Sequence, residues 1–240
     1  IKAVVHFVRI NKTAYPDLSV TVRSAGTCMA GGPLNDSIII DVTRYMHGIK
    51  ELTKEYTRVL PGTFYRDFEP EAAKLGVLLP CYTASKNLNT LGGMVGNNSA
   101  GEKTLKYGKT EDYITELSVI FSDGNEYVVK PLDKEGLKSK LSQEDFEGEV
   151  YRKVWDIVST NKELLARAKP TVSKNSAGYY LWNVWDGQTF NINKLIVGSQ
   201  GTLCIVTDIK FKLVPVKKKS KLFVIFMRNL DHLSELVNEI

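Results

Sequence analysis

Cysteine and histidine are both scarce in this chain, with three of each among 240 residues. The cysteines Cys28, Cys81 and Cys204 lie far apart, are odd in number and form no C-x-x-C pair, so the sequence indicates neither a disulfide framework nor a zinc site. No H-x-x-H or H-E-x-x-H spacing occurs either, and we expect no metal site built from this chain. This cysteine usage favours a reduced, cytoplasmic protein, and a peripheral place at a membrane stays open.

Long apolar runs and strong charge are absent as well. No stretch of 18 apolar residues occurs, so we expect no transmembrane segment. The formal net charge of +5 is mild and spread along the chain, which argues against a nucleic-acid partner. The densest basic run, residues 217–221, is interpreted as a solvated linker. With 43% hydrophobic and 25% charged residues, the composition is that of an ordinary globular protein with a substantial core.

The two common phosphate-binding motifs are missing too. Gly108-Lys109-Thr110 matches the end of a P-loop, but the preceding glycine, Gly101, lies two residues too far back, and the flanks are not strand and helix. The dinucleotide fingerprint G-x-G-x-x-G has no match at the required spacing. Any nucleotide bound by this chain is therefore held in another way.

Glycine-rich segments are what the sequence has instead. They are SAGTCMAGG at residues 24–32, GGMVGNNSAG at 92–101 and GSQGT at 198–202. Backbone N–H groups in such segments can approach a ligand closely and form an anion-binding concavity. Each segment alone could be only a tight turn, but three in one chain favour a large, phosphate-bearing ligand wrapped by backbone.

Helical and strand patterns alternate irregularly, which predicts an α+β fold rather than regular βαβ units. Residues 131–149 are charged and poor in apolar residues, so they are interpreted as part of an exposed insertion. Helices are expected at residues 1–10, 63–76 (ended by Gly76) and 149–168, with another near the C-terminus. Strands are expected at 18–23, 37–42, 56–62 and 221–227, with a hairpin over 115–129 that turns at Asp123-Gly124, and a β segment over 194–215 interrupted by a glycine turn.

Both ends of the chain lie inside helical patterns, and the first residue is not Met. We therefore expect this sequence to be a piece of a longer protein.

Four ordered blocks, at residues 22–49, 59–80, 83–114 and 195–215, together resemble the FAD-binding domain of the vanillyl-alcohol oxidase family, with its PCMH-type fold. The segment KPTVSKNSAGYYLW, residues 169–182, is similar to the D-2-hydroxy acid dehydrogenases of that family, which act on D-lactate, glycolate or D-2-hydroxyglutarate. The resemblance implies an oxidoreductase that passes hydride from a hydroxy acid to FAD. The alternatives are a related oxidase of another alcohol or a sugar lactone, and a non-catalytic nucleotide-binding module.

The resemblance also implies a domain organisation. The FAD-binding domain would span 1–216, with subdomains of about 1–79 and 80–216, the cofactor between them and an insertion at about 131–190. Residues 217–240 would begin a truncated substrate domain. The catalytic residues of the family belong to that later domain, so no catalytic residue, metal or electron acceptor can be named from this chain.

Thirteen residues are implied in FAD binding. Thr27 stands where some relatives attach FAD through a histidine, so the FAD here would be non-covalent. Gly93, with an expected positive φ, and Asn97 would contact the flavin. Two departures from the family pattern are Gln200, where Glu is usual, and Cys204, where Gly is usual. The implied cofactor-binding residues are Ser24, Ala25, Gly26, Thr27 and Cys28 at the pyrophosphate, Ser85, Thr90, Gly92, Gly93, Asn97 and Gly101 along the pyrophosphate, ribityl chain and isoalloxazine, and Gly201 and Ile205 near the adenine.

Overall fold

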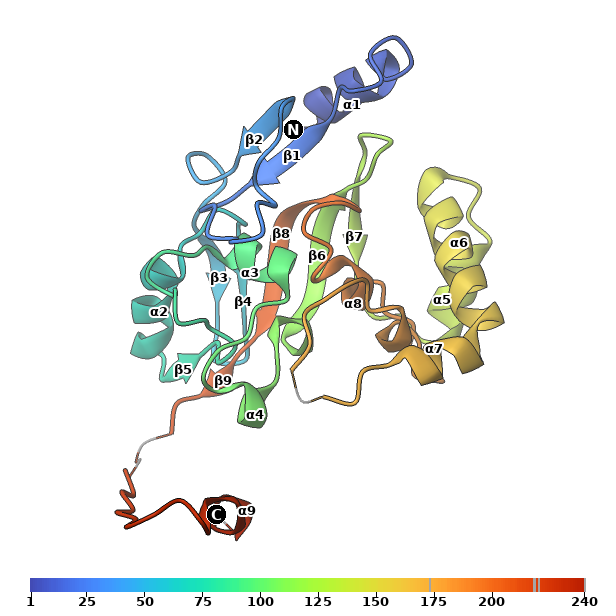
Figure 1. Cartoon of the computed structure of the whole chain (residues 1–240). Helices are drawn as coiled ribbons and strands as arrows, with labels where there is room; N and C mark the ends of the chain where they lie inside the picture. Colours follow the sequence, from blue (N-terminus) through green and yellow to red (C-terminus); the bar gives the residue numbers. More distant parts are fainter. Residues whose placement is uncertain (173, 218, 220, 240) are drawn as a thin grey trace.

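The centre of the structure, a computed structural model, is a five-stranded antiparallel sheet (Figure 1). The structure describes residues 1–172, 174–217, 219 and 221–239. The strand order is β3–β4–β8–β6–β7, so the longest strand, β8, comes from the end of the chain and lies between β4 and β6. The strands are β3 (Ile49–Leu52), β4 (Tyr56–Val59), β6 (Ile114–Ile120), β7 (Glu126–Val129) and β8 (Ile205–Lys212).

The two faces of this sheet differ in chemistry. One face is apolar and fully buried, and Leu117, Ile209 and Phe211 belong to the hydrophobic core. The opposite face carries a ladder of charges, in which Arg58 Nη1 donates to Asp208 Oδ1 at 2.8 Å and also pairs with Glu116. This alternation is the pattern of an antiparallel sheet with a single covered face.

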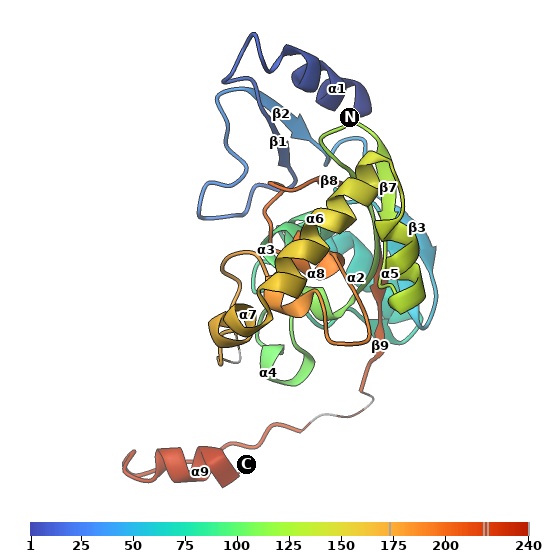
Figure 2. The same cartoon turned by 90° about the vertical axis from the view of Figure 1, so that its right-hand side faces the viewer.

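Helices cover the apolar face of the sheet, and Figure 2 shows α3, α6 and α8 lying together on one side. Their buried side chains, among them Phe68 of α2, Leu91 of α3 and Tyr151 of α6, share one core with the sheet. The helices are α1 (Lys2–Asn11), α2 (Tyr65–Lys74), α3 (Leu91–Asn97), α4 (Thr104–Tyr107), α5 (Lys134–Leu141), α6 (Phe146–Thr160), α7 (Lys162–Ala168), α8 (Asn193–Ile196) and α9 (Leu233–Glu239), with 3-10 turns η1 (Thr110–Asp112) and η2 (Leu181–Asn183).

Two small sheets complete the architecture. β1 (Val20–Arg23) and β2 (Ile38–Asp41) pair in parallel, while β5 (Val77–Leu78) and β9 (Val214–Pro215) pair antiparallel. Parallel neighbours cannot be joined by a hairpin and need a crossover connection. The long glycine-rich loop that starts at Ser24 is therefore the crossover between β1 and β2.

Several predicted elements are confirmed in the mixed α+β architecture. Helix α1, helix α2 and the hairpin β6–β7 agree with the predicted ranges to within two residues at each end. Gly76 follows α2 with a φ of +70°, as expected of a residue that ends a helix.

Other predictions are wrong. The single helix over 149–168 is divided at Asn161, whose φ of −112° and ψ of 27° are not helical. The charged stretch 131–149 contains α5, because Leu132 and Leu137 reach the core. The β segment over 194–215 begins with helix α8. Residues 221–227 are not a strand, since no described strand lies beside them to pair with.

The predicted subdomain boundary at residues 79 and 80 does not separate the sheets. β4, from the first part, pairs with β8 over four residues, from Tyr56–Lys212 to Val59–Ile209. Only β1 and β2 form a sheet of their own within the first 79 residues.

Candidate functional site

The three glycine-rich segments of the sequence meet in one cleft. With the solvent at its mouth, the cleft encloses about 800 Å³. Its walls come from the loop after β1, from helix α3 and from the turn that leads into β8. The lining residues are Val22, Ser24–Cys28, Gly32, Pro33, Pro61, Thr90, Gly92, Gly93, Val95–Asn97, Ile196, Ser199–Gly201, Cys204 and Val206.

Helix α3 is fixed in one wall by its first turn. Thr90 is its N-cap, and Thr90 Oγ1 accepts a hydrogen bond from the Gly93 amide at 3.2 Å. The Gly92 amide donates to Pro61 O at 2.8 Å, and a Cβ on Gly92 would stand 2.6 Å from that oxygen. Only glycine permits such an approach, so Gly92 keeps α3 against Pro61.

The loop after β1 supplies the free backbone donors of the cleft. None of the amides of residues 24–32 donates a hydrogen bond to another residue that the structure describes. These residues are half-buried or exposed, so their N–H groups are open to water or to a ligand. In contrast, the amides of Gly92 and Gly93 are already used within the chain. The run of free N–H groups suits an anionic ligand such as a pyrophosphate.

Gly93 and Ser24 face each other across the cleft. A Cβ added to Gly93 would lie 3.9 Å from Ser24 Cβ and 3.2 Å from Thr90 Oγ1. Gly93 is helical and does not have a positive φ, so that expectation is wrong. The absence of a side chain at Gly93 keeps the space between α3 and Ser24 open.

Ser85 lines a second, adjoining hollow. Thr27, Cys28 and Asn97 line both this hollow and the cleft. Part of its wall is polar, where Thr83 Oγ1 is 2.9 Å from Ser85 Oγ and accepts from Asn89 Nδ2 at 2.8 Å. The buried Asn89 Oδ1 has no partner within the described chain.

Two of the thirteen predicted residues line neither cavity in the described structure. A Cβ on Gly101 would stand 2.1 Å from Tyr82 O. A glycine is therefore needed at this position for the close backbone contact, whether or not a ligand binds. Ile205 is buried at the start of β8, whereas its neighbours Cys204 and Val206 line the cleft. Side chains alternate along a strand, which turns Ile205 away.

Sequence reasoning missed other lining residues, among them Pro61, Ile196 and Gln200. Gln200 has a φ of +54°, and its Oε1 lies 3.1 Å from the position of a Cβ on Gly32. The amide of Gln200 donates to Gly96 O at 2.9 Å, so this residue joins two walls. Its departure from the family pattern was the only signal in the sequence.

Cys204 is the other departure, and it gives the cleft an apolar, uncharged surface. Burial raises the pKa of the Cys204 thiol to about 12, so the thiol is neutral at physiological pH. Together with Ile196 and Val206 it provides the apolar end of the cleft.

Metal-binding and membrane-spanning features are not found in the described part of the chain. No group of three or more His, Cys, Asp or Glu side chains could hold a metal ion there. Among the same residues, no helix combines the length and the apolarity that a bilayer crossing requires.

Comparison with known proteins identifies the family of this chain. The family model described as the FAD binding domain matches residues 1–130, more than half of the sequence. The chain belongs to the FAD binding domain family. The cofactor of this family member is FAD, and the donor-rich cleft fits such a group.

Two curated relatives and one solved structure extend the comparison. The chain is 30% identical over 207 residues to D-2-hydroxyglutarate dehydrogenase of Pseudomonas putida, covering 85% of the chain and 21% of the relative. It is 27% identical over 225 residues to glycolate oxidase subunit GlcD of Bacillus subtilis, covering 92% of the chain and 37% of the relative. A structure of alkyldihydroxyacetonephosphate synthase matches with a TM-score of 0.56 and 17% identity, over 91% of the chain and 30% of that protein, which is a likeness of fold.

The chain thus spans between about a fifth and two fifths of the length of these relatives. What the longer proteins do as a whole is therefore a matter of inference for this chain.

Proposed function

We propose that this chain is the FAD-binding portion of a flavin-dependent oxidoreductase that oxidises a D-2-hydroxy acid. The observation that carries the proposal is the run of amides at residues 24–32 that donate to no other described residue, of which those of Ser24–Cys28 and Gly32 belong to cleft-lining residues. The two relatives, a D-2-hydroxyglutarate dehydrogenase and a glycolate oxidase subunit, support a hydroxy-acid substrate.

Different residues of the cleft would bind different parts of FAD. The amides of Ser24–Cys28 would donate to the pyrophosphate oxygens without a lysine, and the wall around Thr90, Gly93 and Asn97 would hold the ribityl chain and isoalloxazine. The apolar end formed by Ile196, Cys204 and Val206 would receive the adenine, near Gly201. Bound non-covalently, FAD supplies the hydride-accepting chemistry, and this chain binds it, orients it and shields it from water.

The same proposal includes the rest of the protein. An FAD-binding domain would span residues 1–216, and a substrate domain that carries the catalytic residues would begin at 217–240. Its electron acceptor stays unnamed. We place the protein in the cytoplasm or at the periphery of a membrane, which agrees with the three unpaired cysteines Cys28, Cys81 and Cys204.

Flavin titrations test the cofactor assignment. If the free amides bind phosphate, affinity should fall in the order FAD, FMN, riboflavin, because these ligands carry two, one and no phosphate groups. Binding would be followed by the change in flavin absorption and fluorescence on addition of the chain. Equal affinity for FAD and riboflavin, or binding of neither, would contradict the assignment.

Activity assays test the substrate class. A protein that contains the remaining length of the relatives would be mixed with D-lactate, glycolate or D-2-hydroxyglutarate and an artificial electron acceptor. Reduction of the acceptor by one of these acids, and not by its L-enantiomer where it has one, is the expected result. Reduction only by another alcohol or a sugar lactone would favour the related oxidase. FAD binding without any turnover would favour a non-catalytic module.

A further inference from the structure

The loop 174–183 connects the two sides of the cleft. Ser176 Oγ donates to Asn98 O at 3.3 Å, and Asn98 follows the cleft residue Asn97. At the other side, the hydroxyls of Tyr179 and Thr202 are 2.7 Å apart, and Thr202 follows the cleft residue Gly201. The loop therefore contacts the end of α3 and the turn before β8.

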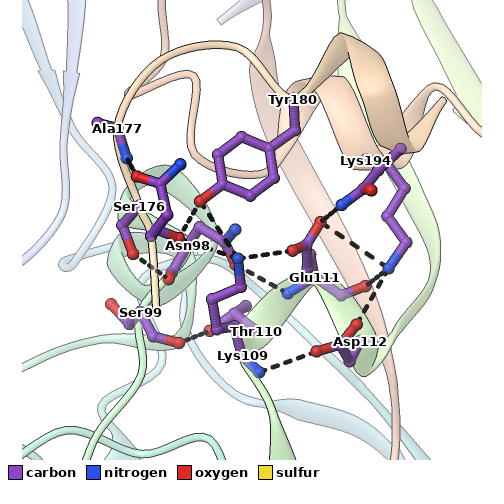
Figure 3. Close-up of polar contacts among 12 residues, drawn as sticks. Asn98, Ser99, Lys109, Thr110, Glu111, Asp112, Ser176, Ala177, Tyr180 and Lys194 are labelled. Atoms are coloured by element: carbon purple, nitrogen blue, oxygen red, sulfur yellow. Dashed lines mark hydrogen bonds and ion pairs between the residues drawn. The ribbon is translucent and has the colours of Figure 1, made fainter. Parts of the chain in front are cut away.

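Lys109 anchors this loop from below, as Figure 3 shows. Its Nζ donates to Asn175 O at 2.9 Å and lies 3.2 Å from Tyr180 Oη. The third partner is Glu111 Oε1, at 2.9 Å. All three N–H groups of the ammonium are thus used, and the Lys109 side chain is only 13% exposed.

Glu111 connects the same cluster to helix α3 and to the far end of the loop. Its side chain is 3% exposed, and Oε2 accepts from Asn183 Nδ2 at 3.2 Å. Its amide donates to Asn98 Oδ1 at 3.0 Å, and Lys194 Nζ donates to its carbonyl at 2.9 Å. Asn98 itself is fully buried and has a positive φ of 46°, a conformation that needs support from its surroundings.

A buried ion pair is a costly way to gain stability, because both charges lose their hydration. Removing Lys109 is destabilising, since the buried Glu111 carboxylate keeps only Lys194, at 3.9 Å, as an ionic partner. The Lys109–Glu111 pair thus contacts the loop near both of its ends, at Asn175 through Lys109 and at Asn183 through Glu111.

We propose that Lys109 is a positioning residue for the FAD cleft, which acts by holding the loop 174–183 across the cleft's two edges. This inference rests on the proposed function. The closed loop fixes Asn98 beside α3 and Thr202 beside the 198–202 turn, so closure and FAD binding strengthen each other. Thermodynamic reciprocity then requires FAD to reduce opening of the loop by the same factor by which closure tightens FAD binding.

The test uses the full 240-residue chain and the variant Lys109→Met, with Lys153→Met as a matched control. Lys153 also pairs with a glutamate, Glu149, but on the exposed surface of α6, where its side chain is 72% exposed. Tyr179→Phe is a milder second variant, because it removes one hydroxyl from a residue that is 46% exposed. It keeps the proposal testable if Lys109→Met does not fold.

Two measurements are made on each protein. The first is the Kd for FAD by titration. The second is the rate of trypsin cleavage after the exposed Lys174, under native conditions, with and without FAD. Cleavage there requires opening, because the carbonyl of the next residue, Asn175, is held by Lys109.

Lys109→Met should raise both the Kd and the cleavage rate at Lys174 by about tenfold or more, since a buried charge loses its partner. Tyr179→Phe should raise both by a smaller factor, with an unchanged melting temperature, and Lys153→Met should change neither. FAD should protect Lys174 in the unaltered chain. Loss of stability alone would increase cleavage at all exposed lysines and would not be selective for Lys174.

Two outcomes overturn the proposal in distinguishable ways. If the unaltered chain binds FAD and the two variants leave its Kd unchanged, the coupling is wrong and the proposed function stands. If the unaltered chain binds no FAD, the proposed function fails and the coupling fails with it.

Discussion

At the scale of single residues, Gly93 gives the sharpest test of the cleft. Gly93→Val should abolish saturable FAD binding, because the branched side chain would occupy the space between α3 and Ser24. The fold should persist, since valine in a helix is more favourable than glycine and only Thr90 Oγ1, at 3.2 Å, must yield slightly.

Ala166→Val, on the exposed surface of α7, is the control for adding a branched residue to a short helix. Circular dichroism and an FAD titration on both variants would decide. A folded Gly93→Val chain with normal FAD affinity would refute the place of Gly93 at the cofactor.

Asp123 is a second residue with a measurable role, in the turn of the β6–β7 hairpin. Burial raises the pKa of its carboxyl, but hydrogen bonds from Tyr127 and Asn125 outweigh this and keep the pKa below its ordinary value of 3.8. A lowered folded-state pKa means that the stabilisation is present above about pH 3.8 and is lost as the pH falls through the folded value. Asp123→Ala should therefore lower the free energy of unfolding by about 0.5–1.5 kcal/mol at neutral pH, because the turn loses the hydrogen bonds from Tyr127 and Asn125.

Urea unfolding of the Asp123→Ala and unaltered chains at pH 7 and near pH 3 would measure this. The difference between the two free energies of unfolding should shrink at the acidic pH. A difference that is constant with pH would show that the carboxylate charge does not stabilise the turn.

At the scale of elements, the sequence predicts those whose signals are local. Gly76 ends α2, and Asp123-Gly124 turns the β6–β7 hairpin, because both depend on the backbone preferences of a few neighbouring residues. The apolar periodicity of α1 is likewise contained within the helix itself.

Elements that depend on distant partners are less predictable. Residues 221–227 have the composition of a strand but no described neighbour, while β3 (Ile49–Leu52) has weak strand character and is held by pairing with β4. The break at Asn161 is a further example. Its side chain donates to Ile157 O at 2.9 Å and competes with helix continuation, a choice that composition does not reveal.

Helix α6 offers a prediction at this scale. Its N-cap Asp145 accepts a hydrogen bond from the Gly148 amide at 2.9 Å. Asp145→Ala should lower the free energy of unfolding by about 0.5–2 kcal/mol, because the Gly148 amide in the first turn loses its side-chain acceptor. FAD affinity should stay unchanged, since α6 lies outside the cleft.

Asp156→Ala, in the same helix but at an exposed interior position, is the control and should change stability much less. Thermal unfolding and FAD titration of both variants would measure the effect. Equal effects of the two substitutions would mean that the cap of α6 does not limit stability.

At the scale of the whole molecule, the cleft could be anticipated only in part. The sequence itself showed the three glycine-rich segments, and the fold brings them together from both halves of the chain. The contributions of Pro61 and Ile196 depend on tertiary packing, and no local signal marks them. Gly101 is the converse case. It belongs to a glycine-rich segment and was predicted to bind FAD, but it does not line the cleft, and its lack of a side chain is explained by the close contact with Tyr82 O.

The segment 221–226 leads to a prediction about association. Leu222, Phe223 and Phe226 are 90%, 79% and 93% exposed, and they follow one another closely with no described neighbour to cover them. Burial of each such side chain contributes about 1.5–3 kcal/mol, so contact between copies is favoured as concentration rises.

We expect the 240-residue chain to self-associate through this segment. The triple variant Leu222→Ser, Phe223→Ser and Phe226→Ser should be monomeric at concentrations where the unaltered chain is not, with the same FAD affinity, because these residues lie outside the cleft. Light scattering after gel filtration across a range of concentrations would show it. Identical masses for both proteins at every concentration would exclude this segment as the contact.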